Sequence, residues 1–244
     1  MDGLNPNLKS STSALMKEFH AITHNIANAS TAGFKRRMSS FSGELAEQSA
    51  KLGKNNSVSK VEFNSNIDFS QGHLNHTERP LDVAIIGEGF FVVEGPEGAA
   101  YTRNGQFRRS SAGQLVDFQG RMISGENGPI TIPPEVSDSD LDISGDGSIY
   151  AAGANVGKLR MVEFGAGLSG LEPIGDNCYK ASEGTLPVPA ISSGVEQGYM
   201  ESSNVDTVKE TVNLMTVSRM YEASMKVISK KSDSTKAILD VAMG

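Results

Sequence analysis

Two histidines one helical turn apart are the first residues in this 244-residue chain whose types and spacing could do chemistry. His20 and His24 stand at positions i and i+4, which places both imidazoles on one helical face, as in a zinc pair. No glutamate follows in an HExxH arrangement, and the sequence indicates no third ligand. We therefore expect these histidines to pack in a helix or at an interface, with no metal bound.

Two glycine-rich segments have the composition of phosphate-binding loops but not the context. Gly87-Glu88-Gly89 and Gly145-Asp146-Gly147 lack the Gly-Lys-Ser/Thr of a P-loop, and both lead into strand-like residues. Asp138, Asp140 and Asp142 alternate without the glycine and final glutamate of a calcium loop, so a solvated strand face is expected. No spacing suggests a Ser-His-Asp triad. We expect no enzyme, no cofactor and no small-molecule substrate.

The bulk composition argues against two further classes of protein. The net charge is −7 and the pI is near 5.2, whereas a general nucleic-acid binder needs a basic footprint. No apolar run approaches the roughly twenty residues of a membrane span. The single cysteine, Cys178, allows no intrachain disulfide. No cleaved signal peptide is visible, which leaves two destinations open: the cytosol, or export without a cleaved signal.

The histidines lie in an N-terminal segment with strong helical periodicity. Its apolar residues recur at spacings of three and four, which puts a stripe on one helical face. The stripe consists of Leu4, Leu8, Thr12, Leu15, Phe19, Ile22 and Ile26. Gly33 can take a left-handed conformation after the last turn, and Phe34 can fold back onto the helix. The segment carries few charges, so we expect the helix to be covered on more than one side.

The segment after this helix is predicted to be a connecting arm. Residues 36–47 are mixed in character and could hold one or two helical turns. Residues 61–69 alternate apolar and polar side chains at period two, which indicates short half-buried strands. We expect an extended arm over residues 36–77 that contains some β structure.

A strong β signal begins near residue 81. The runs Leu81–Ile86 and Phe90–Val93 are separated by Gly87-Glu88-Gly89, which predicts a hairpin between them. Turn signals then recur at short intervals, and no long helical pattern intervenes. Residues 142–150 repeat the strand-turn-strand pattern. The sequence therefore predicts an antiparallel β domain over residues 78–200.

Helical periodicity returns at the C-terminal end. Asn204 is expected to be the N-cap, and nothing breaks the helix before Gly244. Roughly forty residues would make a rod of about 60 Å. The residues predicted to pack against other subunits are Asn204, Val205, Val208, Val212, Leu214, Met215, Val217, Tyr221, Met225 and Ile228. On the N-terminal helix they are Leu4, Leu8, Leu15, Phe19, Ile22 and Ile26.

We predict an α+β fold in which long N- and C-terminal helices form a coiled-coil-like α domain, with the antiparallel β domain inserted between them. The segments are the N-terminal helix at 1–35, the arm at 36–77, the β domain at 78–200 and the C-terminal helix at 201–244. Two amphipathic helices of unequal length leave apolar surface for other chains. Repeated head to tail, such a contact gives an open helical assembly. The residues alone thus favour a polymer subunit over the alternative, a helical hairpin within one chain.

Several blocks of sequence, in order, resemble the bacterial flagellar rod and hook proteins. The block after the N-terminal helix and the block at the start of the β domain match most clearly, with further matches at 101–107, 113–116 and 198–205. The matching residues are Asn28, Thr31, Gly33, Phe34 and Lys35, followed by Arg79, Pro80, Leu81, Asp82, Gly87, Gly89, Phe90 and Phe91. Glu78 departs from the family, which more usually has a small residue or glycine there.

The resemblance is closest to the rod members, and among them to the proximal rod type. It implies a structural subunit of the flagellar basal-body rod, the drive shaft that transmits torque from motor to hook, which polymerises through its terminal helices. It also implies export by the flagellar apparatus into the periplasm-spanning rod, with copies of itself and neighbouring rod and hook proteins as partners. A distal rod or short hook-type axial protein is the alternative within the family. Outside it, the alternative is a carbohydrate- or peptide-binding β domain with helical oligomerisation tails.

Overall fold

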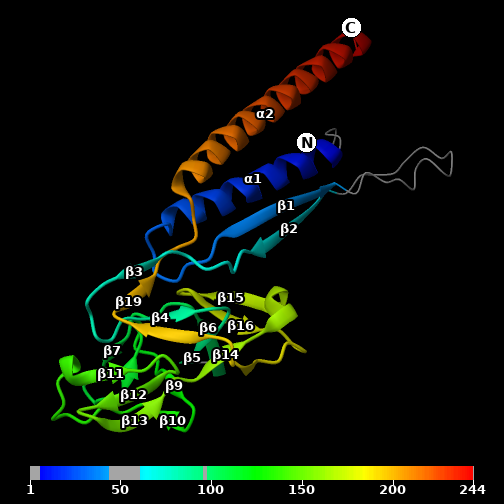
Figure 1. The fold of residues 1–244 in the computed structure, drawn as a ribbon. Helices are drawn as coiled ribbons and strands as arrows, with labels where there is room; N and C mark the ends of the chain where they lie inside the picture. The colour runs from blue at the N-terminus through cyan, green and yellow to red at the C-terminus, as the bar shows by residue number, and fades with distance from the viewer. Residues whose placement is uncertain (1–5, 44–60, 96–97, 244) are drawn as a thin grey trace. The chain divides into compact units, whose positions relative to one another are not determined.

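A computed structural model of the chain describes residues 6–43, 61–95 and 98–243 (Figure 1). The chain divides into two compact units. One comprises residues 1–27, 37–67 and 206–244, and we call it the helix–hairpin unit. The other comprises residues 28–36 and 68–205, and we call it the β unit. Each is described by itself.

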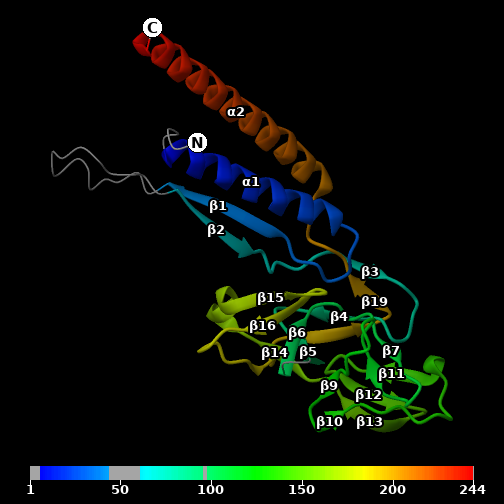
Figure 2. The ribbon, with the colours of Figure 1, turned by 180° about the vertical axis from the view of Figure 1, so that it is seen from behind.

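The helix–hairpin unit contains α1 (Pro6–Ala27), β1 (Arg37–Gly43), β2 (Val61–Ile67) and α2 (Thr207–Met243). β1 and β2 pair antiparallel from Arg37 opposite Ile67 to Gly43 opposite Val61. α1 packs against both strands of this hairpin and against α2, and both views show the hairpin beside α1 (Figures 1 and 2). The sparsely charged N-terminal helix is therefore covered on more than one side, as its composition predicts.

The helical turns predicted at residues 36–47 are wrong for residues 37–43, which form β1. The strand predicted within residues 61–69 is confirmed as β2. A strand needs a hydrogen-bonded neighbour, and β1 supplies it although its own sequence has no clear period. Residues 44–47 lie outside the described residues.

The predicted coiled-coil-like α domain is wrong. The described part of the chain has two α-helices, its strands account for more residues than its helices do, and the helices share their unit with a β hairpin. A coiled coil needs a continuous seam between its helices. Among the described side chains of α2, only Glu210 and Val217 are buried, and both views show α2 diverging from α1 (Figures 1 and 2). Helical periodicity identifies an apolar face but does not say what covers it.

The β unit is built from antiparallel strands. Its largest sheet has six strands in the order β15–β16–β6–β5–β14–β17, and a second sheet has the order β11–β12–β13. The other strands pair as β4 with β18, β3 with β19, β7 with β8 and β9 with β10. The strands are β3 (Leu74–His76), β4 (Val83–Ile86), β5 (Phe90–Gly95), β6 (Gly98–Thr102), β7 (Arg108–Arg109), β8 (Leu115–Val116), β9 (Ser124–Gly125), β10 (Gly128–Pro129), β11 (Leu141–Ile143), β12 (Ser148–Ala151), β13 (Ala154–Lys158), β14 (Met161–Glu163), β15 (Leu171–Gly175), β16 (Cys178–Ala181), β17 (Val188–Pro189), β18 (Gly194–Gln197) and β19 (Tyr199–Glu201). Short 3-10 turns lie at Asp138–Asp140 and Gly165–Gly170.

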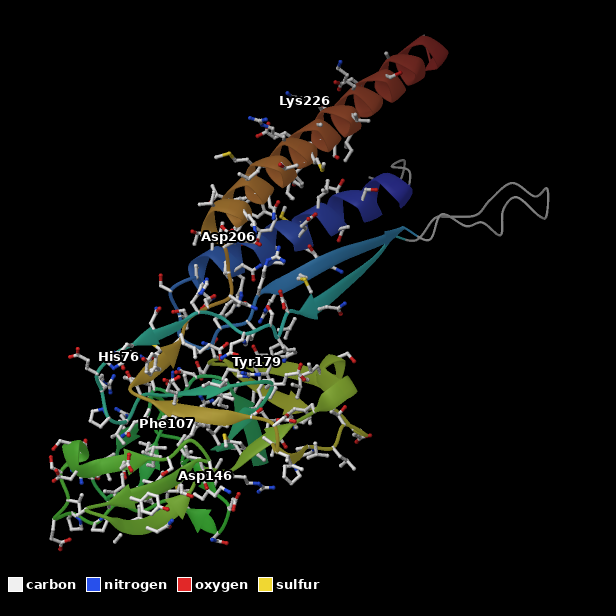
Figure 3. The ribbon with its side chains drawn as sticks, viewed as in Figure 1. His76, Phe107, Asp146, Tyr179, Asp206 and Lys226 are labelled. Carbon is white, nitrogen blue, oxygen red and sulfur yellow. The ribbon has the colours of Figure 1, made fainter. Side chains whose placement is uncertain are left out.

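A cluster of buried apolar side chains forms the core of the β unit. It draws residues from strands throughout the unit, including Ile85 from β4, Leu115 from β8 and Ile149 from β12. Phe91 and Phe107 meet edge to face, with ring centroids 5.0 Å apart, and Figure 3 shows Phe107 within the unit. Edge-to-face pairs stabilise a core beyond the area they bury.

The hairpin predicted at Gly87-Glu88-Gly89 is wrong. β4, before it, pairs with β18, whereas β5, after it, pairs with β6 and β14. Gly89 N donates to Ser193 Oγ at 2.9 Å, so a distant residue holds this segment. By contrast, the hairpin predicted at residues 142–150 is confirmed, because β11 pairs with β12 across Gly145-Asp146-Gly147.

Candidate functional site

Three blocks that are far apart in the sequence meet at Glu201 in the β unit. Lys35 Nζ lies 2.6 Å from Glu201 Oε1, and Arg103 Nη1 lies 3.5 Å from Glu201 Oε2. None of the three side chains is more than 2% exposed. We call Lys35, Arg103 and Glu201 the clasp. It consists of one carboxylate shared by two cations and removed from water.

Backbone groups and an aromatic ring complete the clasp. Lys35 Nζ also donates to the Ser70 carbonyl at 2.7 Å, and Gly72 N donates to Glu201 Oε1 at 2.9 Å. The Arg103 guanidinium lies over the Phe90 ring, 5.0 Å from its centroid. Burial lowers the pKa of Lys35, and the neighbouring Glu201 carboxylate acts in the opposite direction. Buried charges of this kind are tolerated only with partners.

Residues 28–36, which follow α1, are bound into the β unit as a strap. Gly33 N donates to the Glu201 carbonyl at 2.8 Å. Arg36 N donates to Asn204 Oδ1 at 2.7 Å, and Asn177 Nδ2 donates to the carbonyl of Ala32 at 3.0 Å. The strap is thus hydrogen-bonded to the segment 201–204 that precedes α2.

The signature residues of the strap serve this docking. Gly33 has φ +66°, and a Cβ there would lie 2.5 Å from Asn104 N, so both its backbone and its surroundings require glycine. Phe34 and Lys35 are buried. Asn28 and Thr31 form the turn that leads in, with Thr31 N donating to the Asn28 carbonyl at 3.1 Å.

The second predicted motif lies mainly in the core of the β unit. Leu81, Asp82, Gly89, Phe90 and Phe91 are buried. Arg79 is exposed and lies 3.5 Å from the Asp82 carboxylate. Pro80 accepts a hydrogen bond from Gln197 Nε2 through its carbonyl, and Gly87 lies against Ser193. These residues therefore build the scaffold rather than a surface.

The apolar residues of α2 separate into two faces. At about 100° per residue, one set falls on a single side and is buried or half-buried. This covered face consists of Glu210, Leu214, Val217, Tyr221, Ser224 and Ile228. Asn25 of α1 reaches it, since Asn25 Nδ2 lies 3.4 Å from Glu210 Oε2. Of the predicted packing residues, Leu214, Val217, Tyr221 and Ile228 are on this face.

The other face of α2 is exposed along five turns. Its residues are spaced by four, four, four, three and four positions, and we call them the open stripe. They are Val208, Val212, Thr216, Met220, Ala223 and Val227, all exposed. Val208 is 72% and Val212 58% exposed. Met215 beside the stripe and Met225 at the edge of the covered face are also exposed, so α2 carries apolar surface that its own chain leaves uncovered.

The cap of α2 differs from the prediction. α2 begins at Thr207, and Asp206 Oδ1 accepts from Val208 N and Lys209 N, each at 3.1 Å, so Asp206 caps the helix. Figure 3 shows it at the first turn, with Lys226 farther along α2. Asn204 instead uses its side chain in the β unit, where Asn204 Nδ2 donates to the carbonyl of Asp68 at 2.8 Å. Val205 also precedes the helix.

The N-terminal packing residues are divided between covered and half-covered positions. Ile22 is buried within the helix–hairpin unit, and Leu15, Phe19 and Ile26 are half-buried. Leu8 belongs to α1, and Leu4 lies outside the described residues. Whether subunits pack on these residues stays a prediction.

His20 and His24, the candidate zinc pair, differ in their exposure to solvent. His20 is exposed, whereas His24 is partly buried, and burial together with Arg37 lowers the His24 pKa. Among the described residues, no group of three His, Cys, Asp or Glu side chains could share a metal ion. The solvated strand face predicted for the aspartates is wrong for Asp138 and Asp140, which lie in a 3-10 turn, where Arg109 pairs with Asp138 at 3.1 Å.

None of the helices in the described part of the chain has the length and hydropathy of a membrane span.

A hollow of about 330 Å³ is lined by Arg108, Arg109, Ser110, Ser111, Val116 and Gly120. Arg108 Nε already donates to the Asp117 carbonyl and Arg109 Nη1 to that of Val136. Each arginine is thus tied to a backbone carbonyl of the β unit.

Sequence reasoning missed two groups of residues. Arg103 and Glu201 lie inside the matched blocks 101–107 and 198–205, but nothing local indicates that they share a buried site with Lys35. The members of the open stripe between Thr216 and Val227 recur at helical spacing in the sequence, but that spacing does not show which face of α2 is left exposed.

Comparison with known proteins gives matches over most of the chain. The family described as the flagellar hook protein FlgE/F/G D1 domain matches residues 84–151, and the flagellar basal body rod FlgEFG protein C-terminal family matches residues 196–241. The chain is 33% identical to the flagellar basal-body rod protein FlgG of Buchnera aphidicola subsp. Schizaphis graminum, over 91% of this chain and 92% of that protein. It is 31% identical to the FlgF of Caulobacter vibrioides, over 93% and 92%. The FlgF of Salmonella typhimurium is also 31% identical, over 86% of each chain.

Proposed function

The chain belongs to the flagellar basal-body rod proteins of the FlgF and FlgG type, and from that premise we propose that it polymerises into the rod through the open stripe of α2. It is a structural subunit of the flagellum, and its place is the basal body. The observation that carries the proposal is the exposure of six residues at helical spacing on a helix whose other apolar face is already covered.

Burial of this stripe supplies the free energy of assembly. Fully burying a valine or methionine side chain contributes about 1.5–3 kcal/mol, and the stripe offers Val208, Val212, Met220 and Val227. Thr216 and Ala223 between them are small, which allows a neighbouring helix to approach closely. The charged Arg219 and Lys226 lie along the same helix and can pair with acidic groups of a neighbour.

The partners follow from this surface. We expect other copies of the chain and adjacent axial proteins of the rod and hook to cover the open stripe. Many small packing contacts shared among neighbours make a stiff shaft that can transmit torque. Export by the flagellar apparatus, a periplasm-spanning position and the proximal subtype stay predictions that rest on the family resemblance.

The test uses substitutions that the folded monomer tolerates. Val212→Asp and Met220→Asp each place a charge in the open stripe, whereas the control Ser229→Asp places the same charge on another exposed part of α2. We expect all three to fold, as judged by circular dichroism. Only the control should restore rods and swimming to a strain that lacks the protein. If all three variants formed rods equally well, the open stripe would not be part of the interface between subunits.

A further inference from the structure

The six-stranded sheet of the β unit has two exposed edges, β15 and β17. Large apolar side chains surround them: Ile174 on β15 is 50% exposed, Val188 on β17 is 51% exposed, and Leu186 and Ile191 beside β17 are 79% and 93% exposed. An exposed edge with apolar side chains is a template onto which a strand of another molecule can add. Neighbouring copies in a polymer present such edges to one another at high effective concentration.

The register of β17 shows which of its backbone groups point outward. Ala190 N donates to the Met161 carbonyl, and Pro189 lies opposite Val162. Hydrogen-bonded and non-hydrogen-bonded pairs alternate in an antiparallel ladder, so residue 189 turns its backbone away from β14. That residue is a proline, which has no N–H to offer. Pro187, two residues earlier, stands at the same phase of the alternation.

The opposite edge has the same arrangement. Ser182 N donates to the Gly170 carbonyl, and the ladder continues with Leu171 opposite Ala181 and Pro173 opposite Tyr179. Residues 171 and 173 therefore turn their backbones away from β16. The N–H of Leu171 is already donated to the Leu168 carbonyl, and residue 173 is again a proline. Neither outward position from 171 to 173 offers a free N–H.

We propose that Pro173, Pro187 and Pro189 close both edges of this sheet to strand addition between copies of the chain. At residues 171, 173, 187 and 189 an added strand would find outward carbonyls but no free N–H donors for its own carbonyls, and unpaired buried carbonyls are costly. Contacts between β units are then limited to side chains, which leaves the helices to direct polymerisation. The closed edges follow from the sheet's own register, and only their role in assembly rests on the proposed function.

The test restores the missing donors in the full chain. A variant with Pro173→Ala, Pro187→Ala and Pro189→Ala is compared with Pro134→Ala, an exposed proline in the turn closed by Val136 N and the Pro133 carbonyl. Both variants remove proline rigidity, but only the triple variant restores N–H donors at the two sheet edges. Both variants also carry Val212→Asp, which blocks association through the open stripe, so that any remaining association can be assigned to the sheet edges.

We expect the triple variant to associate at a concentration at least about tenfold below that of the control, by sedimentation velocity. Hydrogen exchange should show new protection at positions 173, 187 and 189 on association. Equal association of the two variants would overturn the proposal, as would association without that protection. If the triple variant loses its native circular dichroism, Pro189→Ala alone is judged by the same two criteria.

Discussion

Lys35 Nζ and Glu201 Oε1 lie 2.6 Å apart although 166 positions separate the two residues. Lys35 belongs to the strap that follows α1, and Glu201 belongs to the segment that precedes α2. The clasp therefore joins, inside the β unit, the two stretches of chain that lead to the terminal helices. The ion pair thus links the matched block that ends at Lys35 to the matched block at residues 198–205.

The shared carboxylate predicts non-additive substitutions. Lys35→Met leaves an Arg103–Glu201 pair, and Arg103→Met leaves a Lys35–Glu201 pair, so each single variant still has one cation for the buried carboxylate. The double variant leaves the Glu201 carboxylate without a cation and should lose about 3–5 kcal/mol of unfolding free energy, more than the sum of the single losses. Urea denaturation of the four proteins measures the coupling, and additive losses would show that the cations act independently.

Two glycines with positive φ make a matched pair. A Cβ at Gly120, with φ +85°, would meet nothing within 4 Å, whereas one at Gly33 would meet Asn104 N at 2.5 Å. Gly120→Ala should cost only the left-handed conformation, about 1–2 kcal/mol. Gly33→Ala should cost distinctly more, since the strap must also move. Denaturant midpoints compare the two, and equal losses would mean that the close approach carries no energy.

Glu78 is a candidate for stabilisation. It has φ +61°, a conformation unfavourable for a residue with a side chain. Glu78→Gly should raise the unfolding free energy by about 0.5–1 kcal/mol, because relief of the strain exceeds the entropy that glycine loses on folding. Glu78→Ala keeps the strain and serves as the control. A melting temperature unchanged by the glycine would contradict the expectation.

His24 predicts a pH dependence for the helix–hairpin unit. Burial and Arg37 lower its folded pKa, so below pH 6.5 the unfolded chain binds a proton that the folded chain does not. The stability that neutral His24 allows is complete above the pKa of the unfolded chain, and it declines as the pH falls toward the lower pKa of His24 in the folded chain. His24→Gln should flatten the decline between pH 7 and pH 5 in thermal melts. A slope identical to that of the native chain would assign the decline to other groups.

Sequence alone determined the features that depend on neighbouring residues. The period of residues 61–69 predicted β2, glycine and aspartate around 146 predicted a hairpin, and the motif blocks identified the family, because turn chemistry and apolar alternation are local. The same reasoning placed a strand on either side of Gly87-Glu88-Gly89 but paired them wrongly. Hydrogen-bond partners are chosen among all strands of the chain.

Only the tertiary structure decided which apolar faces are covered and where the charges go. Periodicity could not divide the residues of α2 into a face against α1 and an open stripe, because that depends on the position of α1. Nor could it assign Lys35 and Arg103 to one carboxylate, because a buried charge is stabilised by groups that folding brings from distant parts of the sequence. The tertiary structure thus brings Lys35, Arg103 and Glu201 together in the clasp and leaves the open stripe of α2 exposed to solvent.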